Sequence, residues 1–151
     1  MIMIAAMSSD RVIGAGDRMP WAVPEEYAQF LSQVRDQCIL MGRRSWEIFG
    51  ADLVQSENLV LTRSDAVEGK ARPVHSLDEA VTYAESRNQR LFVAGGASVY
   101  RLALPHATAM HLSTIHGDFE GDAVFPAFGP EEWTLRVERK YERYTYREFS
   151  R

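Results

Sequence analysis

Three short polar segments of this chain follow predicted strands, and their residue types suit the binding of a phosphate. They are Gly42-Arg43-Arg44-Ser45, Thr62-Arg63-Ser64 and Gly95-Gly96, the last of which opens a predicted helix. Guanidinium groups and the free amides at a helix start are donors that bind phosphate readily. Open α/β sheets bind ligands at the carboxyl ends of their strands. Together the segments predict one site for a phosphorylated dinucleotide, and the arginines favour a 2′-phosphate and so NADP over NAD.

A glutamate at the start of another predicted helix is the second candidate. Pro24 suits the first position of that helix. Its apolar residues at helical spacing are Val23, Tyr27, Phe30, Leu31 and Val34. Glu26 falls at the edge of this apolar stripe, where it could point into a cleft, acquire a raised pKa by desolvation and bind a planar amidine-like edge. The residues alone leave open the alternative that Glu26 only favours the helix N-terminus electrostatically.

Other chemistries lack their motifs. The chain has neither a phosphate-binding Gly-x-x-x-x-Gly-Lys-Ser/Thr loop nor a Gly-x-Ser-x-Gly nucleophile turn. None of its four histidines stands at zinc-ligand spacing, so we expect no metal site. Cys38 lies in an apolar run, which indicates a buried and unreactive thiol.

The elements that must position these residues alternate between strand and helix over the first two thirds of the chain. The predicted strands there are Ile2–Met7, Cys38–Met41, Asn58–Leu61 and Leu91–Val93, with a long loop over Ser8–Pro20. The predicted helices begin at Pro24, cover Arg43–Phe49, run from the capping box at Ser76 to about Arg87, and cover Ala97–Ala103. The strand candidates nearer the C-terminus are Met110–Ile115, Trp133–Val137 and Tyr144–Phe149. This order predicts an α/β fold with a mixed, mostly parallel sheet, an antiparallel C-terminal edge, and helices on both faces.

Composition is that of an ordinary globular protein. Of 151 residues, 46% are hydrophobic and 25% are charged, which predicts one domain over residues 1–151. The net charge of −4, without a basic block, argues against a nucleic-acid partner. No apolar run is long enough to span a membrane, and Met1–Ser8 is too short for a signal peptide, so we expect a cytoplasmic protein. We also expect it to be a monomer.

Nearly the whole chain resembles the dihydrofolate reductase family. The matching stretches are Ile4-Ala5-Ala6, Asp10-Arg11-Val12-Ile13-Gly14, Met19-Pro20-Trp21, Met41-Gly42-Arg43, Trp46-Glu47, Leu61-Thr62-Arg63-Ser64, Gly95-Gly96 with Val99-Tyr100, and Glu120-Gly121-Asp122 with Phe125-Pro126. The resemblance implies the mixed sheet expected above and NADPH-dependent reduction of a 7,8-dihydropterin to the tetrahydropterin. Hydride would pass from the nicotinamide to C6 of the pterin, and a proton would reach N5.

The resemblance also implies a role for individual residues. Glu26 corresponds to the single acidic residue of the pterin pocket, Trp21 helps hold an ordered water that delivers the proton, and Met19 belongs to the mobile loop over the nicotinamide. The substrate-binding residues it implies are Ile4, Ala5, Glu26, Tyr27, Phe30, Phe49, Leu53, Ala94, Tyr100 and Ser113. The cofactor-binding residues it implies are Ala6, Ile13, Gly14, Gly42, Arg43, Arg44, Ser45, Thr62, Arg63, Ser64, Gly95, Gly96, Ala97, Ser98, Val99 and Tyr100. In the family the bond between the two glycines is usually cis.

One departure from the family bears on the substrate. Ser56 stands where folate-reducing members have an arginine that pairs with the α-carboxylate of the folate glutamate, and Glu57 beside it would repel that carboxylate. Ala94 replaces a larger aliphatic residue, which predicts a wider pocket. These differences favour a dihydropterin without the benzoylglutamate tail, such as dihydromethanopterin. The alternatives are an ordinary dihydrofolate reductase and a non-catalytic pterin- or nucleotide-binding protein.

Overall fold

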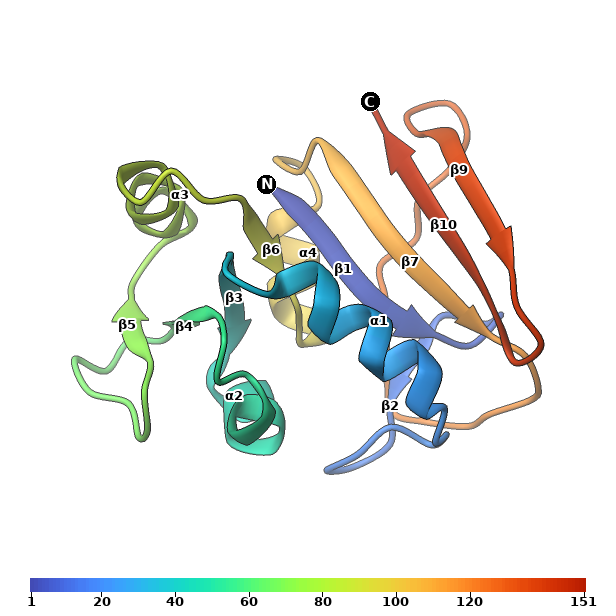
Figure 1. Ribbon diagram of the computed structural model, residues 1–151, viewed down its shortest axis with the longest axis horizontal. Coiled ribbons are helices and arrows are strands. Elements are labelled where there is room, and N and C mark those ends of the chain that lie inside the picture. The colour runs from blue at the N-terminus through green and yellow to red at the C-terminus, as the bar shows by residue number, and fades with distance from the viewer.

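The computed structural model describes residues 1–151 without a gap and contains one large and one small sheet. The eight-stranded sheet has the order β5-β4-β3-β6-β1-β7-β10-β9, and β2 pairs with β8 in the small sheet (Figure 1). The strands are β1 (Ile2–Met7), β2 (Val12–Gly14), β3 (Cys38–Gly42), β4 (Glu57–Leu61), β5 (Arg72–Val74), β6 (Leu91–Val93), β7 (Ala109–Ile115), β8 (Ala123–Val124), β9 (Thr134–Lys140) and β10 (Tyr144–Ser150). The helices are α1 (Pro24–Val34), α2 (Arg43–Phe49), α3 (Leu77–Ser86) and α4 (Ala97–Ala103), with a short 3-10 helix, η1 (Gly50–Asp52).

Strand direction in the large sheet follows the predicted division. The pairings from β5 through to β7 are all parallel, whereas β10 pairs antiparallel with both β7 and β9. Parallel neighbours need crossover connections, and helices supply them between the early strands. The predicted mixed sheet with an antiparallel C-terminal edge is confirmed.

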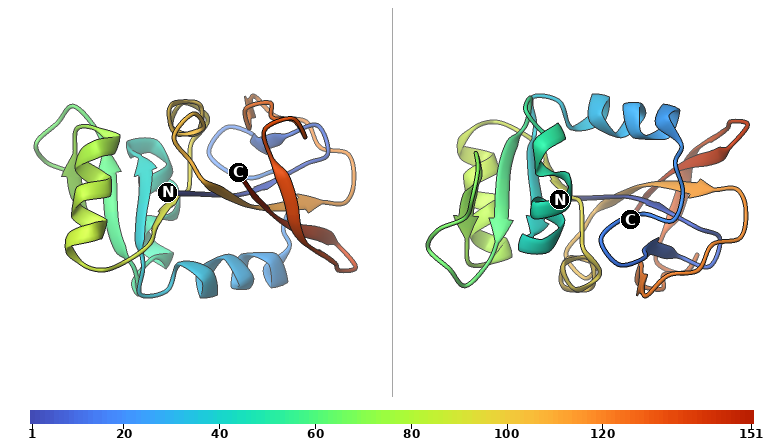
Figure 2. Two further views of the ribbon diagram at one scale, coloured as in Figure 1. Left: turned by 90° about the horizontal axis from the view of Figure 1, so that it is seen from above. Right: turned by 90° about the horizontal axis from the view of Figure 1, so that it is seen from below.

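Alternation along the central strands assigns their side chains to two faces of the sheet. In β3, Cys38 and Leu40 pack into the larger core cluster, and Ile39 and Met41 pack into the second one. Helices α3 and α4 cover the first face, and α1 and α2 cover the second. Figure 2 shows α1 and α4 on opposite faces of the sheet. Because both faces are covered, the strands are apolar throughout rather than alternating.

Local sequence signals place the helix starts. Pro24 occupies the first turn of α1, with Glu25 and Glu26 beside it. Ser76 caps α3, because its hydroxyl accepts a hydrogen bond from the amide of Glu79 at 3.1 Å. The Glu79 carboxylate in turn accepts from the amide of His75 at 2.7 Å, one residue before the position that a capping box predicts.

Three short strands were not among the predicted elements. Strand β2 lies inside the segment predicted to be a loop, and it exists because Val12 and Gly14 pair with β8, more than one hundred positions away. Strand β5 contains Pro73, which is tolerated because β5 is an edge strand of the large sheet. At the other edge, β9 begins one residue later and runs three residues further than the predicted Trp133–Val137.

None of the helices is both long and apolar enough to cross a membrane.

Candidate functional site

The carboxyl ends of β3 and β6 meet at the glycine pair. The amide of Gly42 donates to the carbonyl of Gly95 at 2.8 Å, and the Gly95–Gly96 peptide bond is cis, as the resemblance predicts. Gly95 has a φ of 113°, in the region that favours glycine. A Cβ atom at either glycine would lie 3.3 Å from the hydroxyl of Ser45, so the backbone of this turn lies directly against the start of α2.

A groove of about 850 Å³ opens at these strand ends and brings together most of the residues expected to bind a cofactor. The expected cofactor residues that line it are Ile13, Gly14, Gly42, Arg43, Arg44, Ser45, Thr62, Arg63, Gly96, Ala97, Ser98 and Val99. Arg43 forms an ion pair with Glu47 at 3.3 Å, Arg44 pairs with Asp17, and Arg63 is exposed. Three solvated guanidinium groups beside a glycine-rich turn are a donor set that fits a phosphorylated dinucleotide.

A small apolar cavity of about 110 Å³ adjoins this groove. The expected substrate residues that line it are Ile4, Ala5, Glu26, Tyr27, Phe30, Phe49, Ala94 and Tyr100, and Met19, Ala6 and Gly95 line it as well. Five residues line both the cavity and the groove: Ile13, Met19, Ser45, Phe49 and Gly96. Ligands bound in the two spaces would therefore meet at this boundary.

Glu26 is the acidic residue of the cavity. Its side chain is 6% exposed, and desolvation raises its pKa, partly opposed by a side-chain hydrogen bond with Ser113. Its neighbour Glu25 instead faces outward and accepts from the Arg143 guanidinium at 2.6 Å, which lowers the Glu25 pKa. The structure thus separates two adjacent carboxylates and places the one at the edge of the apolar stripe inside the cavity.

Tyr100 lines the cavity, whereas Trp21 packs in a small core cluster with Phe119 and Ala6, the latter a residue of the cavity lining. The Tyr100 hydroxyl donates to the carbonyl of Ile4 at 2.7 Å, and burial, together with the charge of Glu26, raises the Tyr100 pKa. Trp21 packs edge-on against Phe119, with ring centroids 5.3 Å apart. The Trp21 indole N–H is buried without a protein acceptor. Buried donors are normally satisfied, so this N–H is suited to hydrogen-bond a bound water.

Four expected site residues line neither space: Trp21, Leu53, Ser64 and Ser113. Leu53 is 2% exposed, packs in the second core cluster and lines a separate groove, so its predicted contact with the pterin stays a prediction. Ser64 donates to the carbonyl of Ala66 at 3.0 Å within its own loop, because the turn at residues 62–66 satisfies its hydroxyl locally. Ser113 does not line the cavity itself and reaches it only through Glu26.

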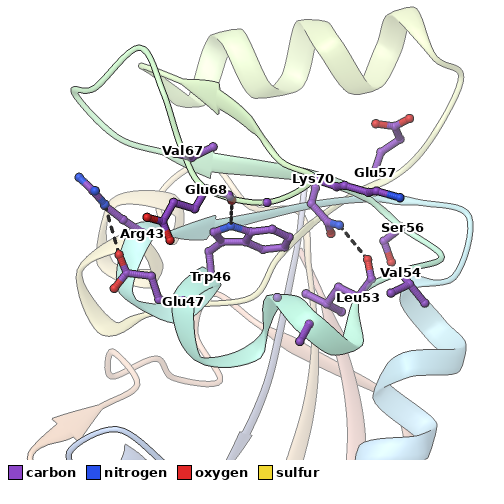
Figure 3. A pocket seen from close by; sticks show the side chains of 14 residues that line it. Arg43, Trp46, Glu47, Leu53, Val54, Ser56, Glu57, Val67, Glu68 and Lys70 are labelled. Atoms are coloured by element: carbon purple, nitrogen blue, oxygen red, sulfur yellow. Dashed lines mark hydrogen bonds and ion pairs between the residues drawn. The ribbon is translucent and has the colours of Figure 1, made fainter.

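The departure at Ser56 has a local explanation in the structure. The Ser56 hydroxyl donates to the carbonyl of Val34 at the end of α1, at 3.0 Å. Glu57 pairs with Arg87 at 3.0 Å and points toward α3 (Figure 3), so the expectation that Glu57 repels a substrate carboxylate is wrong. Both residues line a third groove, of about 680 Å³, between η1 and residues 67–70, which shares no lining residue with the Glu26 cavity.

Sequence reasoning missed three basic residues of the cofactor groove, Arg18, His75 and Arg101. His75 follows β5, whose three residues gave no recognisable strand pattern. Its ring contacts the carbonyl of Thr62 at 2.8 Å and the carboxylate of Asp65 at 3.1 Å, and the first of these contacts raises the His75 pKa. Had β5 been recognised, the rule that ligands bind after strands would have pointed to His75. Among acidic residues, histidines and Cys38, no group of three lies together as a metal site requires.

Buried Cys38 has the environment expected from its apolar run. Its thiol lies 3.1 Å from the side-chain oxygen of Gln89, and desolvation raises its pKa to about 11. A thiol with so high a pKa is protonated near neutral pH and is a poor nucleophile.

Comparison with known proteins identifies the family. A family model described as dihydrofolate reductase matches residues 1–150. The chain is 37% identical over 134 residues to dihydrofolate reductase type A13 of Escherichia coli, covering 88% of this chain and 81% of that protein. It is 34% identical over 132 residues to the dihydrofolate reductase of Bacillus subtilis, covering 87% of this chain and 79% of the relative.

The fold agrees with these matches. A solved structure of dihydrofolate reductase from Enterococcus faecalis, complexed with NADP(H) and RAB-propyl, superposes with a TM-score of 0.87 at 25% identity. The superposition covers 99% of this chain and 95% of that one. With the matched family model and the shared fold in agreement, the chain belongs to the dihydrofolate reductase family.

Proposed function

We propose that this chain reduces 7,8-dihydrofolate to 5,6,7,8-tetrahydrofolate with NADPH. As a member of the dihydrofolate reductase family, the chain is an NADPH-dependent oxidoreductase. The observation that supports this reaction most directly is the junction of the two spaces: the apolar cavity that contains Glu26 shares five lining residues with the arginine-lined groove. Hydride transfer requires donor and acceptor atoms in contact, and a shared boundary allows that contact.

The groove fits NADPH by the chemistry of its donors. Arg43, Arg44 and Arg63 would bind the 2′-phosphate, and the Gly95–Gly96 turn would lie along the pyrophosphate. When bound, NADPH supplies the hydride, while the protein orients both ligands. Ala6 and Ile13, which line the cavity, would contact the nicotinamide side.

Glu26 would anchor the pterin. An ionised carboxylate can accept two hydrogen bonds from the amino group and ring N–H of the pterin edge, and the apolar surroundings strengthen both bonds. The Trp21 indole N–H, buried without a protein partner, would hold a water that delivers the proton to N5 of the pterin. Met19 lines both spaces and would exclude other water when its loop closes.

Steady-state oxidation of NADPH by the purified chain tests this proposal. We expect dihydrofolate to be required and to be consumed in equal amounts with NADPH, with tetrahydrofolate as the product. Binding of NADPH without dihydrofolate-dependent oxidation would overturn the proposal and leave a non-catalytic binding protein.

A second substrate, dihydromethanopterin, is favoured by one observation only. Ser56 provides no cation for a folate glutamate, and its hydroxyl is engaged by the carbonyl of Val34. The named relatives are dihydrofolate reductases, and they favour dihydrofolate over this substrate. Measuring kcat/KM for dihydrofolate and dihydromethanopterin under the same conditions decides between them. A clearly higher kcat/KM for dihydromethanopterin would make it the favoured substrate.

A further inference from the structure

The tip of the β9–β10 hairpin, residues 141–144, holds the start of α1 by two side-chain contacts. The Arg143 guanidinium donates two hydrogen bonds to the Glu25 carboxylate, at 2.6 and 2.5 Å. One helical turn further on, the Tyr144 hydroxyl donates to the side-chain oxygen of Gln29 at 2.7 Å. Figure 2 shows the hairpin tip beside the beginning of α1. Two contacts one turn apart restrain both the position and the direction of the helix start.

The hairpin tip is itself fixed to the large sheet. His116, directly after β7, donates its backbone amide to the carbonyl of Arg143 at 2.9 Å. The two ring nitrogens of His116 lie 3.0 Å from the carbonyl of Glu142 and 2.9 Å from the hydroxyl of Thr145. Three contacts from one residue of the sheet therefore make the tip a firm support for α1.

The start of α1 has few fixed points of its own. Its N-cap residue, Val23, makes no side-chain hydrogen bond, and Pro24 has no amide hydrogen to donate. Val23 packs in the small buried cluster that also contains Tyr144. The hairpin tip thus supports the helix start by packing as well as by the ion pair between Arg143 and Glu25.

Glu26 follows Glu25 in the first turn of α1. Because the two residues share the backbone of this turn, a movement of Glu25 also moves Glu26. The Glu26 carboxylate must keep one orientation to accept two hydrogen bonds from the pterin edge, and small misplacements of such an anchor are costly. Burial, followed by the charges of Tyr141, Glu26 and Glu25, raises the pKa of Tyr144, so the hairpin tip lies within electrostatic range of both carboxylates.

We propose that Arg143 is a positioning residue: its ion pair with Glu25 fixes the first turn of α1 and thereby the orientation of Glu26 toward the pterin. This inference rests on the proposed reduction of dihydrofolate. Arg143 lines neither the Glu26 cavity nor the cofactor groove, so it acts on the substrate only through the helix. Loss of the ion pair should therefore weaken the hold on the pterin and leave cofactor binding unchanged.

Arg143→Gln tests this role, because it removes the ion pair and keeps a polar side chain. We expect it to raise the KM for dihydrofolate by about two- to fivefold, the size of one exposed ion pair, with the Kd for NADPH unchanged. A mere loss of folded protein would instead lower kcat and leave KM unchanged. Arg143→Lys keeps the charge but not the paired geometry, so its KM should lie between those of Arg143→Gln and the parent.

The matched control is Arg147→Gln. Arg147 donates to Glu138 at 2.8 Å in an ion pair of the same hairpin. It lies on the opposite face of β10 from Tyr144, because side chains alternate along a strand. Its substitution should leave the KM for dihydrofolate at the parent value.

A double-mutant cycle tests whether Arg143 acts through Glu25. Glu25→Gln should raise the KM for dihydrofolate as Arg143→Gln does. Arg143→Gln should then have no further effect in the Glu25→Gln protein, because the pair is already broken.

The outcomes are distinguishable. An unchanged KM in Arg143→Gln, an equal rise in KM for Arg147→Gln, or additive effects in the double variant would each overturn the positioning role and leave the proposed reaction intact. Absence of dihydrofolate-dependent NADPH oxidation in the parent protein would instead overturn the proposed reaction.

Discussion

The cofactor groove and the Glu26 cavity use charge in opposite ways. The groove, at about 850 Å³, has several exposed guanidinium groups, two of which already pair with acidic neighbours. The cavity, at about 110 Å³, is mostly apolar and contains one carboxylate that is 6% exposed. Solvated charges contribute little individually and are screened by salt, whereas a buried charge interacts strongly and cannot be replaced by a neighbour. The binding free energy in the groove should therefore be shared among several side chains, whereas binding in the cavity should depend mainly on Glu26.

Removing the buried charge is the most severe test of this difference. Glu26→Gln should lower kcat/KM by about 10²–10⁴-fold, because the neutral amide cannot anchor the pterin edge as an anion. NADPH affinity, measured by fluorescence titration, should change little. Near-normal turnover would show that Glu26 only stabilises the helix N-terminus. The proposed difference between the cavity and the groove would then be wrong.

Removing one solvated charge should have a smaller and more selective effect. Arg43→Ala or Arg44→Ala should weaken NADPH binding by about 10- to 100-fold, as expected for the loss of a charge-assisted bond to phosphate. NADH binding should fall far less, and the NADPH loss should shrink at high salt. Equal losses for both cofactors would show that these arginines do not recognise the 2′-phosphate.

Adding a cation at Ser56, in the groove between η1 and residues 67–70, tests whether that groove takes part in binding the substrate tail. Ser56→Arg should improve dihydrofolate binding by about 1 kcal/mol and leave 6-methyl-7,8-dihydropterin unaffected. The gain should be modest, because the substitution also removes the hydrogen bond of Ser56 to the carbonyl of Val34. Glu57→Gln is the companion control, and it should not alter KM because Glu57 pairs with Arg87. A lower KM for dihydrofolate in Glu57→Gln would contradict the orientation of Glu57.

The smallest effect concerns stability. Burial raises the pKa of Glu26 above its unfolded value, so ionised Glu26 destabilises the folded state at neutral pH. This destabilisation is fully present above the folded pKa and disappears as the pH falls toward the ordinary glutamate pKa of 4.5. Glu26→Gln should therefore unfold at a higher temperature than the parent at pH about 7, and the difference should vanish in acid. If the difference in unfolding temperature between Glu26→Gln and the parent stayed the same at every pH, it would come from altered packing and not from the charge of Glu26.

The elements of the fold were predictable wherever the signal was local. Pro24 and Ser76 mark helix starts through contacts within one turn, and the apolar runs of β1, β3 and β6 indicate strands buried on both faces. The edge position of Glu26 on an apolar stripe also follows from helical spacing. Short strands escaped prediction, because β2 and β5 have three residues each and depend on partners distant in sequence.

By itself, the sequence determined which residue types stand after each strand and which carboxylate of the Glu25–Glu26 pair borders the apolar face. Both are consequences of spacing along one element. Only the tertiary structure decided that Glu57 turns to Arg87, that His75 joins the cofactor groove, and that Tyr27 reaches Asp52. Each of these contacts joins side chains from different elements, whose relative positions depend on how the helices pack against the sheet. Spacing along one chain segment cannot fix such positions, because the packing of the whole core sets them.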